Sequence, residues 1–534
     1  MSAHPPAQLV DGPPLTIDKR AQRNILIAMI TALVAVLAAM SGLNVAQQEM
    51  AIELGASQGE VLWIINAYTV ALAALLLPVG AIGDRFGRKP VLLTGLAVFA
   101  IATVGSLLAT TTVMMIAARV LAGVGAAMIM PVTLSIITSS FPPEDKAKAI
   151  GIWAGFAGGG SMIALFVSAF MIDVLTWRWV FALPLVLVAI SAVTSTLFVS
   201  NSKEHSSYRF DTVGSVLSAL AIGGLVLGIH EGPEHGWSAP LTVVALVAAV
   251  ASLVAFVMWE RRTDGPLLDI SAFRDRGLAS GSVTLLIVFA VMFGVFLVLF
   301  PYFQAVLGWS ALLSAAAMLP MTVVMMPMST IAPKIADRIG GRNTMATGVT
   351  IFAIGLATMA LRASVEGGYL SVLPGLVLIG LGMGLTMTPA TQAITETLPV
   401  EKQGVASALN DTSRELGGAV GIALLGSVLA AGYKSAIEPL LAGVPAELAE
   451  PASEGIGAAF AVAARAGDQA PTIIDAAQHA FVDGWVGSMW LGVGMAAVAL
   501  VYLLVRGPVR TTAAAATSPA GADDAVLSTA TSNP

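Results

Sequence analysis

Long apolar segments, each about the length of a membrane-spanning helix, follow one another along most of this chain. A helix needs roughly 20 apolar residues to cross the hydrocarbon core of a bilayer. The pattern therefore predicts an all-α polytopic membrane protein with about fourteen transmembrane helices. The expected spans are residues 24–47, 61–82, 90–109, 113–138, 149–172, 178–199, 213–230, 241–259, 279–303, 311–335, 344–362, 369–395, 404–431 and 484–505.

Composition supports this class of protein. Hydrophobic residues make up 57% of the chain, charged residues 11%, and mean hydropathy is +0.87. A water-soluble protein of this length would need far more charge to cover its surface. There is no cysteine, which excludes disulfides and cysteine-based metal sites or nucleophiles. The polar segment 1–23 lacks the apolar core of a cleaved signal peptide, so we interpret it as a cytoplasmic tail. The Ala/Ser/Thr-rich segment 506–534 is predicted to be a disordered cytoplasmic tail.

Lysine and arginine are distributed unequally between the two sets of loops. If the N-terminus is cytoplasmic, 20 of these residues lie on the cytoplasmic side, while only Arg178, Arg362, Lys434 and Arg465 lie outside. An excess of positive charge marks cytoplasmic loops. We therefore expect a multi-pass protein of the plasma (inner) membrane with both termini in the cytoplasm. The polar segment 432–483 is then an external loop, in part helical.

A short basic motif occurs twice. Residues 83–89 (GDRFGRK) are followed 253 residues later by residues 336–342 (ADRIGGR). Each motif precedes, by two spans, a glycine-rich stretch that ends in proline, at 123–131 and 380–389. Such repetition indicates an internally duplicated transporter. We predict two six-helix halves, 24–200 and 261–505, with two inserted helices in 201–260; the glycines themselves are typical of close helix packing.

The repeated loop carries an acid that topology does not require. Asp84 can accept hydrogen bonds from the free amides at a helix N-terminus and pair with a nearby arginine. We therefore favour a conformational latch over a purely topological anchor of positive charge. The predicted latch residues are Gly80, Asp84, Arg85, Gly87, Arg88, Lys89, Asp337 and Arg338.

Charged residues inside spans are costly and each needs a reason. Arg119 lies about six residues into the span 113–138, where it can face a cavity, snorkel to the interface or bind backbone carbonyls. In the span 404–431, Asp411 and Glu415 are four residues apart and share a helix face. Arg414 can pair with Asp411, which leaves Glu415 as the better proton carrier; alternatively, the three form a local ion-pair network.

Polar and aromatic residues near the end of the first span and the start of the second are candidates to line a substrate cavity. Aromatic rings and amides suit lipophilic cations through cation–π contacts and adaptable hydrogen bonds. A tryptophan at this depth is equally typical of the membrane interface. The candidates are Asn44, Gln47, Trp63, Asn66 and Tyr68.

Together these motifs resemble the major facilitator superfamily, and within it the fourteen-helix drug:proton antiporters that include quaternary-ammonium exporters. The resemblance covers residues 24–505. It rests on residues 80–89, on Arg119 with the following glycines and Pro131, and on the segments 177–181, 232–237 and 410–418.

The resemblance implies an alternating-access exporter of hydrophobic cationic drugs, driven by proton exchange. It further implies a monomer in the lipid bilayer that handles small molecules and protons and needs no cofactor or metal beyond the proton gradient. The residue that matches Arg119 faces the central cavity in that family and influences proton coupling. The region that matches 410–418 carries acids that meet protons or cations.

Three expected features of that family are missing. Ala39 stands where an aspartate is usual, and Ala122 replaces a glutamine. The Gly-Pro and Gly-Gly pairs of the fifth span are Ala164-Leu165 and Ser168-Ala169, and the bend they make could come instead from Gly155 and residues 158–160. These departures keep open the export of an endogenous lipid, siderophore or secondary metabolite with weak or no proton coupling, and also facilitated diffusion.

Other classes of protein are disfavoured. The sequence contains no HExxH zinc motif and no P-loop, so we expect neither an enzyme nor an ATP-driven pump. It also lacks a soluble basic domain, which argues against nucleic-acid binding.

Overall fold

The computed structural model describes residues 18–202 and 210–508, and the described chain is built from helices and short connections without a strand. Within it, fourteen helices are long and apolar enough to cross a membrane. The predicted all-α polytopic fold is therefore confirmed. The predicted terminal tails lie mostly outside the described residues, although the first helix begins at Lys19 rather than at residue 24.

The first half consists of six membrane-spanning helices. These are α1 (Lys19–Leu54), α2 (Gln58–Phe86), α3 (Arg88–Leu107), α4 (Thr112–Ser140), α5 (Pro143–Val174) and α6 (Ala182–Phe198). Local sequence fixes several helix starts. Ser57, for example, forms a capping box with Glu60, and the Thr111 hydroxyl accepts from the amide of Met114. A short 3₁₀ turn, η1 (Trp177–Phe181), joins α5 to α6.

Two helices, α7 (Thr212–His235) and α8 (Pro240–Glu260), lie between the halves in sequence. The second half contains α9 (Arg276–Pro301), α10 (Ala311–Ile339), α11 (Gly341–Arg362), α12 (Gly368–Thr397), α13 (Gln403–Leu440) and α16 (Ala470–Arg506). A 3₁₀ turn, η2 (Ile270–Arg274), leads into α9, and α9 runs into a π-helical turn, η3 (Tyr302–Val306).

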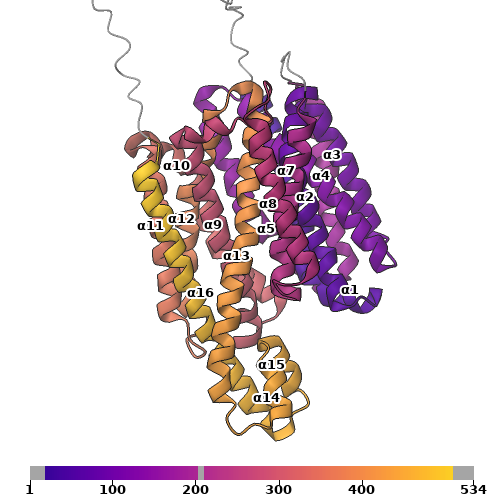
Figure 1. Ribbon diagram of the computed structural model, residues 1–534, viewed down its shortest axis with the longest axis vertical. Helices are drawn as coiled ribbons and strands as arrows, with labels where there is room; N and C mark the ends of the chain where they lie inside the picture. Colours follow the sequence, from indigo (N-terminus) through magenta and orange to yellow (C-terminus); the bar gives the residue numbers. More distant parts are fainter. Residues whose placement is uncertain (1–17, 203–209, 509–534) are drawn as a thin grey trace, which may run out of the picture.

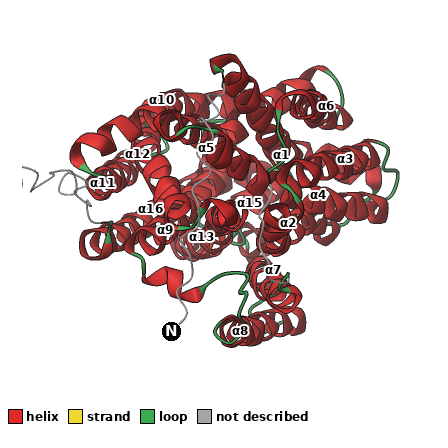
Figure 2. Ribbon diagram, turned by 90° about the horizontal axis from the view of Figure 1, so that it is seen from above, coloured by secondary structure: helices red, strands yellow, loops and turns green. Residues whose placement is uncertain are grey.

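The halves meet along a few helix pairs. Helices α5 and α10 pack together along their length, and α13 packs against α2 and α4. Seen from above, the two bundles lie side by side, while α7 packs against α2 and α8 packs against α7 on the outside (Figure 2). Any polar contact between α5 and α10, or between α2 and α13, therefore joins the two halves.

The segment 432–483 differs from the predicted external loop. Helix α13 continues to Leu440 and α16 begins at Ala470, with two short helices, α14 (Ala446–Ala452) and α15 (Ile456–Ala463), between them. These helices project beyond the bundle (Figure 1), and their buried residues are continuous with the hydrophobic core of the bundle. Its buried residues include Ile437, Val462 and Ile473. The segment is helical over more of its length than the sequence predicts, because alanine and glutamate lower its average hydropathy.

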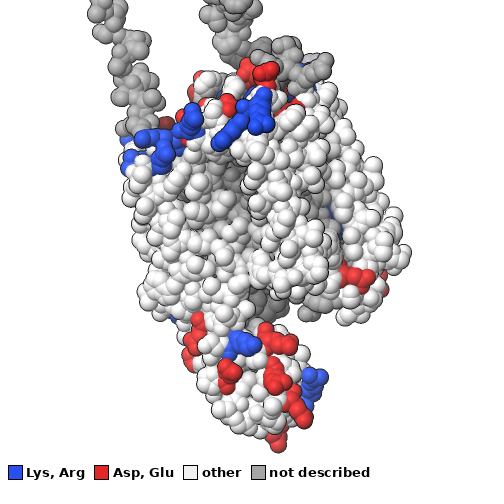
Figure 3. Space-filling model, viewed as in Figure 1, with Lys and Arg blue, Asp and Glu red and all other residues white. Residues whose placement is uncertain are grey.

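Lysine and arginine gather at one end of the molecule, the end from which the described chain leaves α16 (Figure 3). We call this the basic end. The opposite end, with α14 and α15, displays mostly aspartate and glutamate in the same view. The basic end includes Arg88, Lys89, Arg261, Arg262, Arg274, Arg338, Arg342 and Lys402.

The absence of native cysteine makes the orientation directly testable. We expect the basic end to face the cytoplasm because positive loops are retained there. A Glu447→Cys variant should then react with a membrane-impermeant maleimide on intact cells, whereas Arg274→Cys should react only after permeabilisation. Both positions are exposed, so the opposite labelling pattern would invert the topology.

Candidate functional site

The first element of the site is a carboxylate at the N-terminus of α13. Asp84, near the end of α2, accepts hydrogen bonds from the amides of Gly404 at 2.8 Å and Val405 at 3.1 Å. These are among the amides that a helix start leaves unpaired, and the helix dipole favours a negative charge there. Arg88 donates to Asp84 Oδ1 through Nη2 at 2.8 Å and Nε at 3.1 Å. Both side chains are buried, at 2% and 3% exposure.

Arg88 also contacts the second half of the molecule directly. Its Nη2 also donates to the carbonyl of Val400 at 2.9 Å, just before α13. The approach of the two helices requires glycine, because a Cβ at Gly80 would lie 2.5 Å from the carbonyl oxygen of Gly404. Asp84 and Arg88 of the first half are thus bound to the start of α13 in the second half. This is the type of contact that the sequence predicts for Asp84.

The two copies of the repeated motif occupy different environments. Asp84 is buried, while Asp337 and Arg338 are exposed at the end of α10. The other predicted latch residues of the first copy lie around the turn between α2 and α3. Arg85 is half-buried, Gly87 adopts a φ of +114°, and Lys89 donates to the carbonyl of Thr196 at 2.9 Å. Sequence similarity alone does not reveal this asymmetry.

The second element is the charged cluster on α13. The Arg414 guanidinium lies 3.3 Å from Asp411 Oδ1 and donates to the carbonyl of Ala157 in α5 at 2.8 Å. Its charge also sits over the ring of Phe289, 4.7 Å from the centroid. Because α5 belongs to the first half, Arg414 joins the two halves. The predicted pairing with Asp411 is present, but the bond to α5 was not anticipated.

The two acids of this cluster are held differently. Asp411 is fully buried and its Oδ1 also accepts from Asn410 at 3.3 Å, whereas its Oδ2 has no hydrogen-bond partner among the described residues. Glu415 is 8% exposed. No described side chain or backbone group forms a hydrogen bond or an ion pair with the Glu415 carboxylate. Glu415 is therefore the less constrained of the two carboxylates.

The third element is Arg119 on α4. Its Nε donates to the carbonyl of Ile64 at 3.2 Å, and its Nη1 donates to the carbonyl of Ala39 at 3.1 Å. The Arg119 side chain is only 2% exposed, so it does not reach the membrane interface. Of the predicted alternatives, hydrogen bonds to backbone carbonyls therefore describe its contacts, and snorkelling does not. Ala39 is the position at which the resembled family carries an aspartate. Here the backbone carbonyl of Ala39 accepts a hydrogen bond from Arg119 instead.

Tyr68 connects Arg119 to its surroundings. The Arg119 guanidinium lies 4.3 Å from the centre of the Tyr68 ring, and the Tyr68 hydroxyl donates to the carbonyl of Val36 at 3.1 Å. The structure therefore brings together Arg119 and Tyr68 from two helices, which sequence reasoning had not linked.

The remaining cavity candidates are less closely tied to these charges. Asn66 is buried, and Trp63 and Gln47 are half-buried. Asn44 lies within α1, but its side chain falls outside what the structure describes. The structure thus places these four residues on the adjoining ends of α1 and α2.

A polar crossing between α5 and α10 was missed by sequence reasoning. Ser329 of α10 donates to the carbonyl of Gly151 at 3.0 Å, and Thr388 of α12 donates to the carbonyl of Ser329 at 2.8 Å. A Cβ at Gly155 would lie 2.5 Å from Ser329 Oγ. The available signal was the i, i+4 spacing of Gly151 and Gly155. These glycines permit close packing along α5, which runs as one uninterrupted helix.

This construction defines the class of protein. Two six-helix halves meet through polar contacts near the basic end, and charged side chains are buried on helices at their junction. Such an arrangement is that of a polytopic membrane transporter rather than an enzyme.

Comparisons with known proteins give the family. The family model described as "Major Facilitator Superfamily" matches residues 27–210 and 208–422, and the chain belongs to this superfamily. It is 30% identical over 399 residues to the multidrug resistance protein Stp of Mycobacterium tuberculosis, covering 74% of each chain. It is 32% identical over 426 residues to the multidrug efflux pump LfrA of Mycolicibacterium smegmatis, covering 79% of this chain and 84% of LfrA.

A further relative is the tetracenomycin C resistance and export protein of Streptomyces glaucescens, 31% identical over 380 residues, with 71% of this chain and 70% of the relative covered. Among solved structures, the proton:xylose symporter XylE aligns with a TM-score of 0.57 at 13% identity, over 92% of this chain and 97% of XylE. At this identity the similarity to XylE concerns the fold alone. The predicted superfamily is confirmed.

The buried cap can be tested against its exposed counterpart. Asp84→Asn removes the charge that holds Arg88 and the start of α13, which leaves Arg88 buried and unpaired. We expect a loss of about 3 kcal/mol in the free energy of unfolding and a fall in transport. The matched variant Asp337→Asn should change stability by less than about 0.5 kcal/mol, because its side chain is exposed. Thermal unfolding of both purified variants measures the difference, and equal effects would contradict this assignment.

Proposed function

We propose that this protein exports hydrophobic, cationic drugs or toxic compounds across the plasma membrane in exchange for protons. The observation that carries the proposal is the buried Asp411–Arg414–Glu415 cluster, whose arginine binds the other half of the molecule. The similarity to Stp, a multidrug resistance protein, and to LfrA, a multidrug efflux pump, supports export of several drugs. The basic end faces the cytoplasm, and the protein acts as a monomer.

The described conformation is closed at the basic end. Asp84 and Arg88 bind the start of α13, and Ser329 binds Gly151 between α10 and α5. Opening toward the cytoplasm requires the separation of α2 from α13 and of α5 from α10. These polar bonds, together with the packing of α5 against α10 and of α2 against α13, then contribute to the free-energy difference between the two states. The cap at Asp84 is the latch of this cycle.

Glu415 is the proposed proton carrier. A buried carboxylate without a hydrogen-bond partner is stabilised least in its charged form, so it gains most from binding a proton or a cationic substrate. Arg414 already neutralises Asp411. Loading and unloading of Glu415 changes the charge beside Arg414, which is the residue that contacts α5. Proton binding and the separation of the halves are coupled in this way.

A second candidate function rests on Ala39. Arg119 is bound by two backbone carbonyls, so its positive charge has no carboxylate partner among the described residues. A transporter with alanine at this position has one acid fewer for proton coupling. Export of an endogenous lipid, siderophore or secondary metabolite with weak proton coupling is the function that this observation favours.

Substitution of Glu415 distinguishes proton-coupled drug export from export with weak or no proton coupling. In proteoliposomes with an imposed pH gradient, the wild-type protein should move ethidium against its concentration gradient and release protons into the opposite compartment. Glu415→Gln removes the proposed carrier without changing side-chain size, so coupled movement of both should fall to the level of empty liposomes. The exposed Glu396 of α12 provides the matched control, and Glu396→Gln should transport like the wild type.

The remaining outcomes are also informative. Full coupled transport by Glu415→Gln would remove this residue from the mechanism and leave Asp411 as the carrier. Ethidium movement that persists without proton movement would favour uncoupled transport. If the wild-type protein moves no ethidium while remaining folded, the metabolite-export function becomes the better interpretation.

A further inference from the structure

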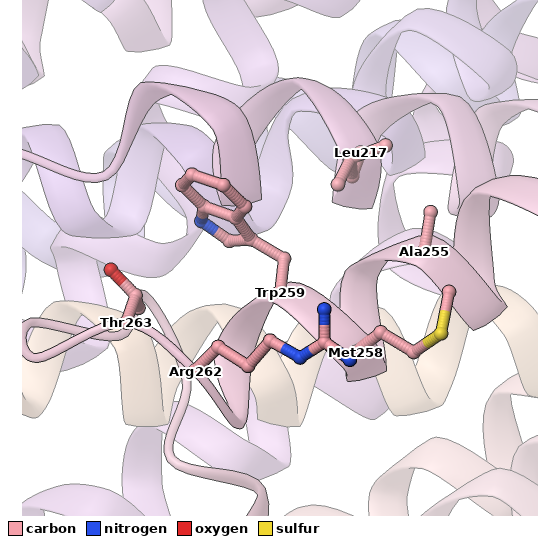
Figure 4. A pocket seen from close by; sticks show the side chains of 6 residues that line it. All are labelled: Leu217, Ala255, Met258, Trp259, Arg262 and Thr263. Atoms are coloured by element: carbon pink, nitrogen blue, oxygen red, sulfur yellow. The ribbon is translucent and has the colours of Figure 1, made fainter.

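A groove at the basic end lies away from the junction of the halves. It has a volume of about 360 Å³ and is formed by one end of α8 with α7 (Figure 4). Its apolar wall is made by Leu217, Ala255 and Met258, and its polar edge by Trp259, Arg262 and Thr263. None of these residues belongs to the transport site described above.

The groove is built around a fixed tryptophan. The Trp259 indole donates to Asp211 Oδ1 at 2.9 Å, and the same oxygen accepts from the amide of Gly214 at 2.8 Å. Asp211 therefore caps α7 and holds the ring of α8 at once. A ring fixed by its N–H keeps one apolar face available as a wall, so the groove is present before any ligand arrives.

Arg262 carries the charge of the groove. It is exposed, it follows the last residue of α8 by two positions, and it forms no ion pair with a described acid. Glu260 is close in sequence but turns inward, where its Oε2 accepts from the amide of Leu268. The guanidinium is therefore available to a ligand that lies at the end of the helix.

The surroundings identify the ligand class. Helix α8 presents a continuous apolar face, including Val247, Val250 and Val254, all more than half exposed. Such a face must be covered by lipid chains, and it ends where Trp259 and Arg262 begin. An aromatic ring and a cation at the end of an apolar helix mark the level of lipid head groups.

We propose that this groove binds an anionic phospholipid of the leaflet at the basic end. Its phosphate accepts from Arg262 and Thr263, and one acyl chain lies along Leu217, Ala255 and Met258. The bound lipid fixes α7 and α8 against the membrane beside α2, the helix that carries Asp84. This inference stands whether or not the proposed drug:proton exchange is correct, because it concerns the inserted helices alone.

The test uses the full-length protein, purified and depleted of lipid, with phosphatidylglycerol and phosphatidylcholine of identical chains as probes. Native mass spectrometry should detect phosphatidylglycerol retained at collision energies that remove phosphatidylcholine. Arg262→Ala should weaken this retention about fivefold, the effect of one basic residue near an anionic head group. Arg261→Ala, a neighbouring exposed arginine outside the groove, is the matched control and should retain the lipid.

A second variant separates the groove from charge alone. Leu217→Trp fills the apolar wall without changing charge, and it should also lower retention of phosphatidylglycerol. Equal losses for Arg261→Ala and Arg262→Ala, or equal retention of both lipids by the wild type, would overturn the proposal. The melting temperature of each lipid-free variant shows whether it is folded before retention is compared.

Discussion

The arrangement of the two halves depends on one buried carboxylate. Asp84 supplies negative charge to the start of α13, and its partner Arg88 reaches the carbonyl of Val400 in the other half. Both groups lose their hydration when buried, so the contact persists only while every hydrogen bond in it is made. A polar contact with these requirements is either complete or absent. It therefore suits a molecule that must change between two defined states.

The buried charges divide the junction into two regions. Near the basic end, Asp84 and Arg88 form a buried ion pair. On α13, Arg414 is shared between Asp411 and the carbonyl of Ala157, while the Glu415 carboxylate forms no hydrogen bond with a described group. One region thus holds the halves together, and the other holds an acid whose charge is not fixed by a partner. Arg414 lies in the second region but also helps to hold the halves together, because it donates to the carbonyl of Ala157 in the first half.

Small residues make these polar contacts geometrically possible. Gly80 brings α2 against Gly404, and Gly155 brings α5 against Ser329. A membrane offers no hydrophobic force between helices, so close packing and hydrogen bonds must supply the association. The position of Ala39, where the family usually has an aspartate, also shows backbone groups supplying a polar contact between helices. Ala39 has lost a carboxylate, yet Arg119 remains bound because helices α1 and α2 offer their carbonyls.

The sequence by itself determined the number of spans and the superfamily, and it predicted a duplication and a set of candidate site residues. These follow from local properties, namely apolar length, charge type and short motifs. Only the tertiary structure decided which copy of the basic motif is buried, that Arg414 binds α5 and that Arg119 lies over the ring of Tyr68. It also showed that the segment 432–483 is a packed helical unit. Each of these facts depends on which distant helices come within hydrogen-bond distance, and a linear pattern carries no information on that distance.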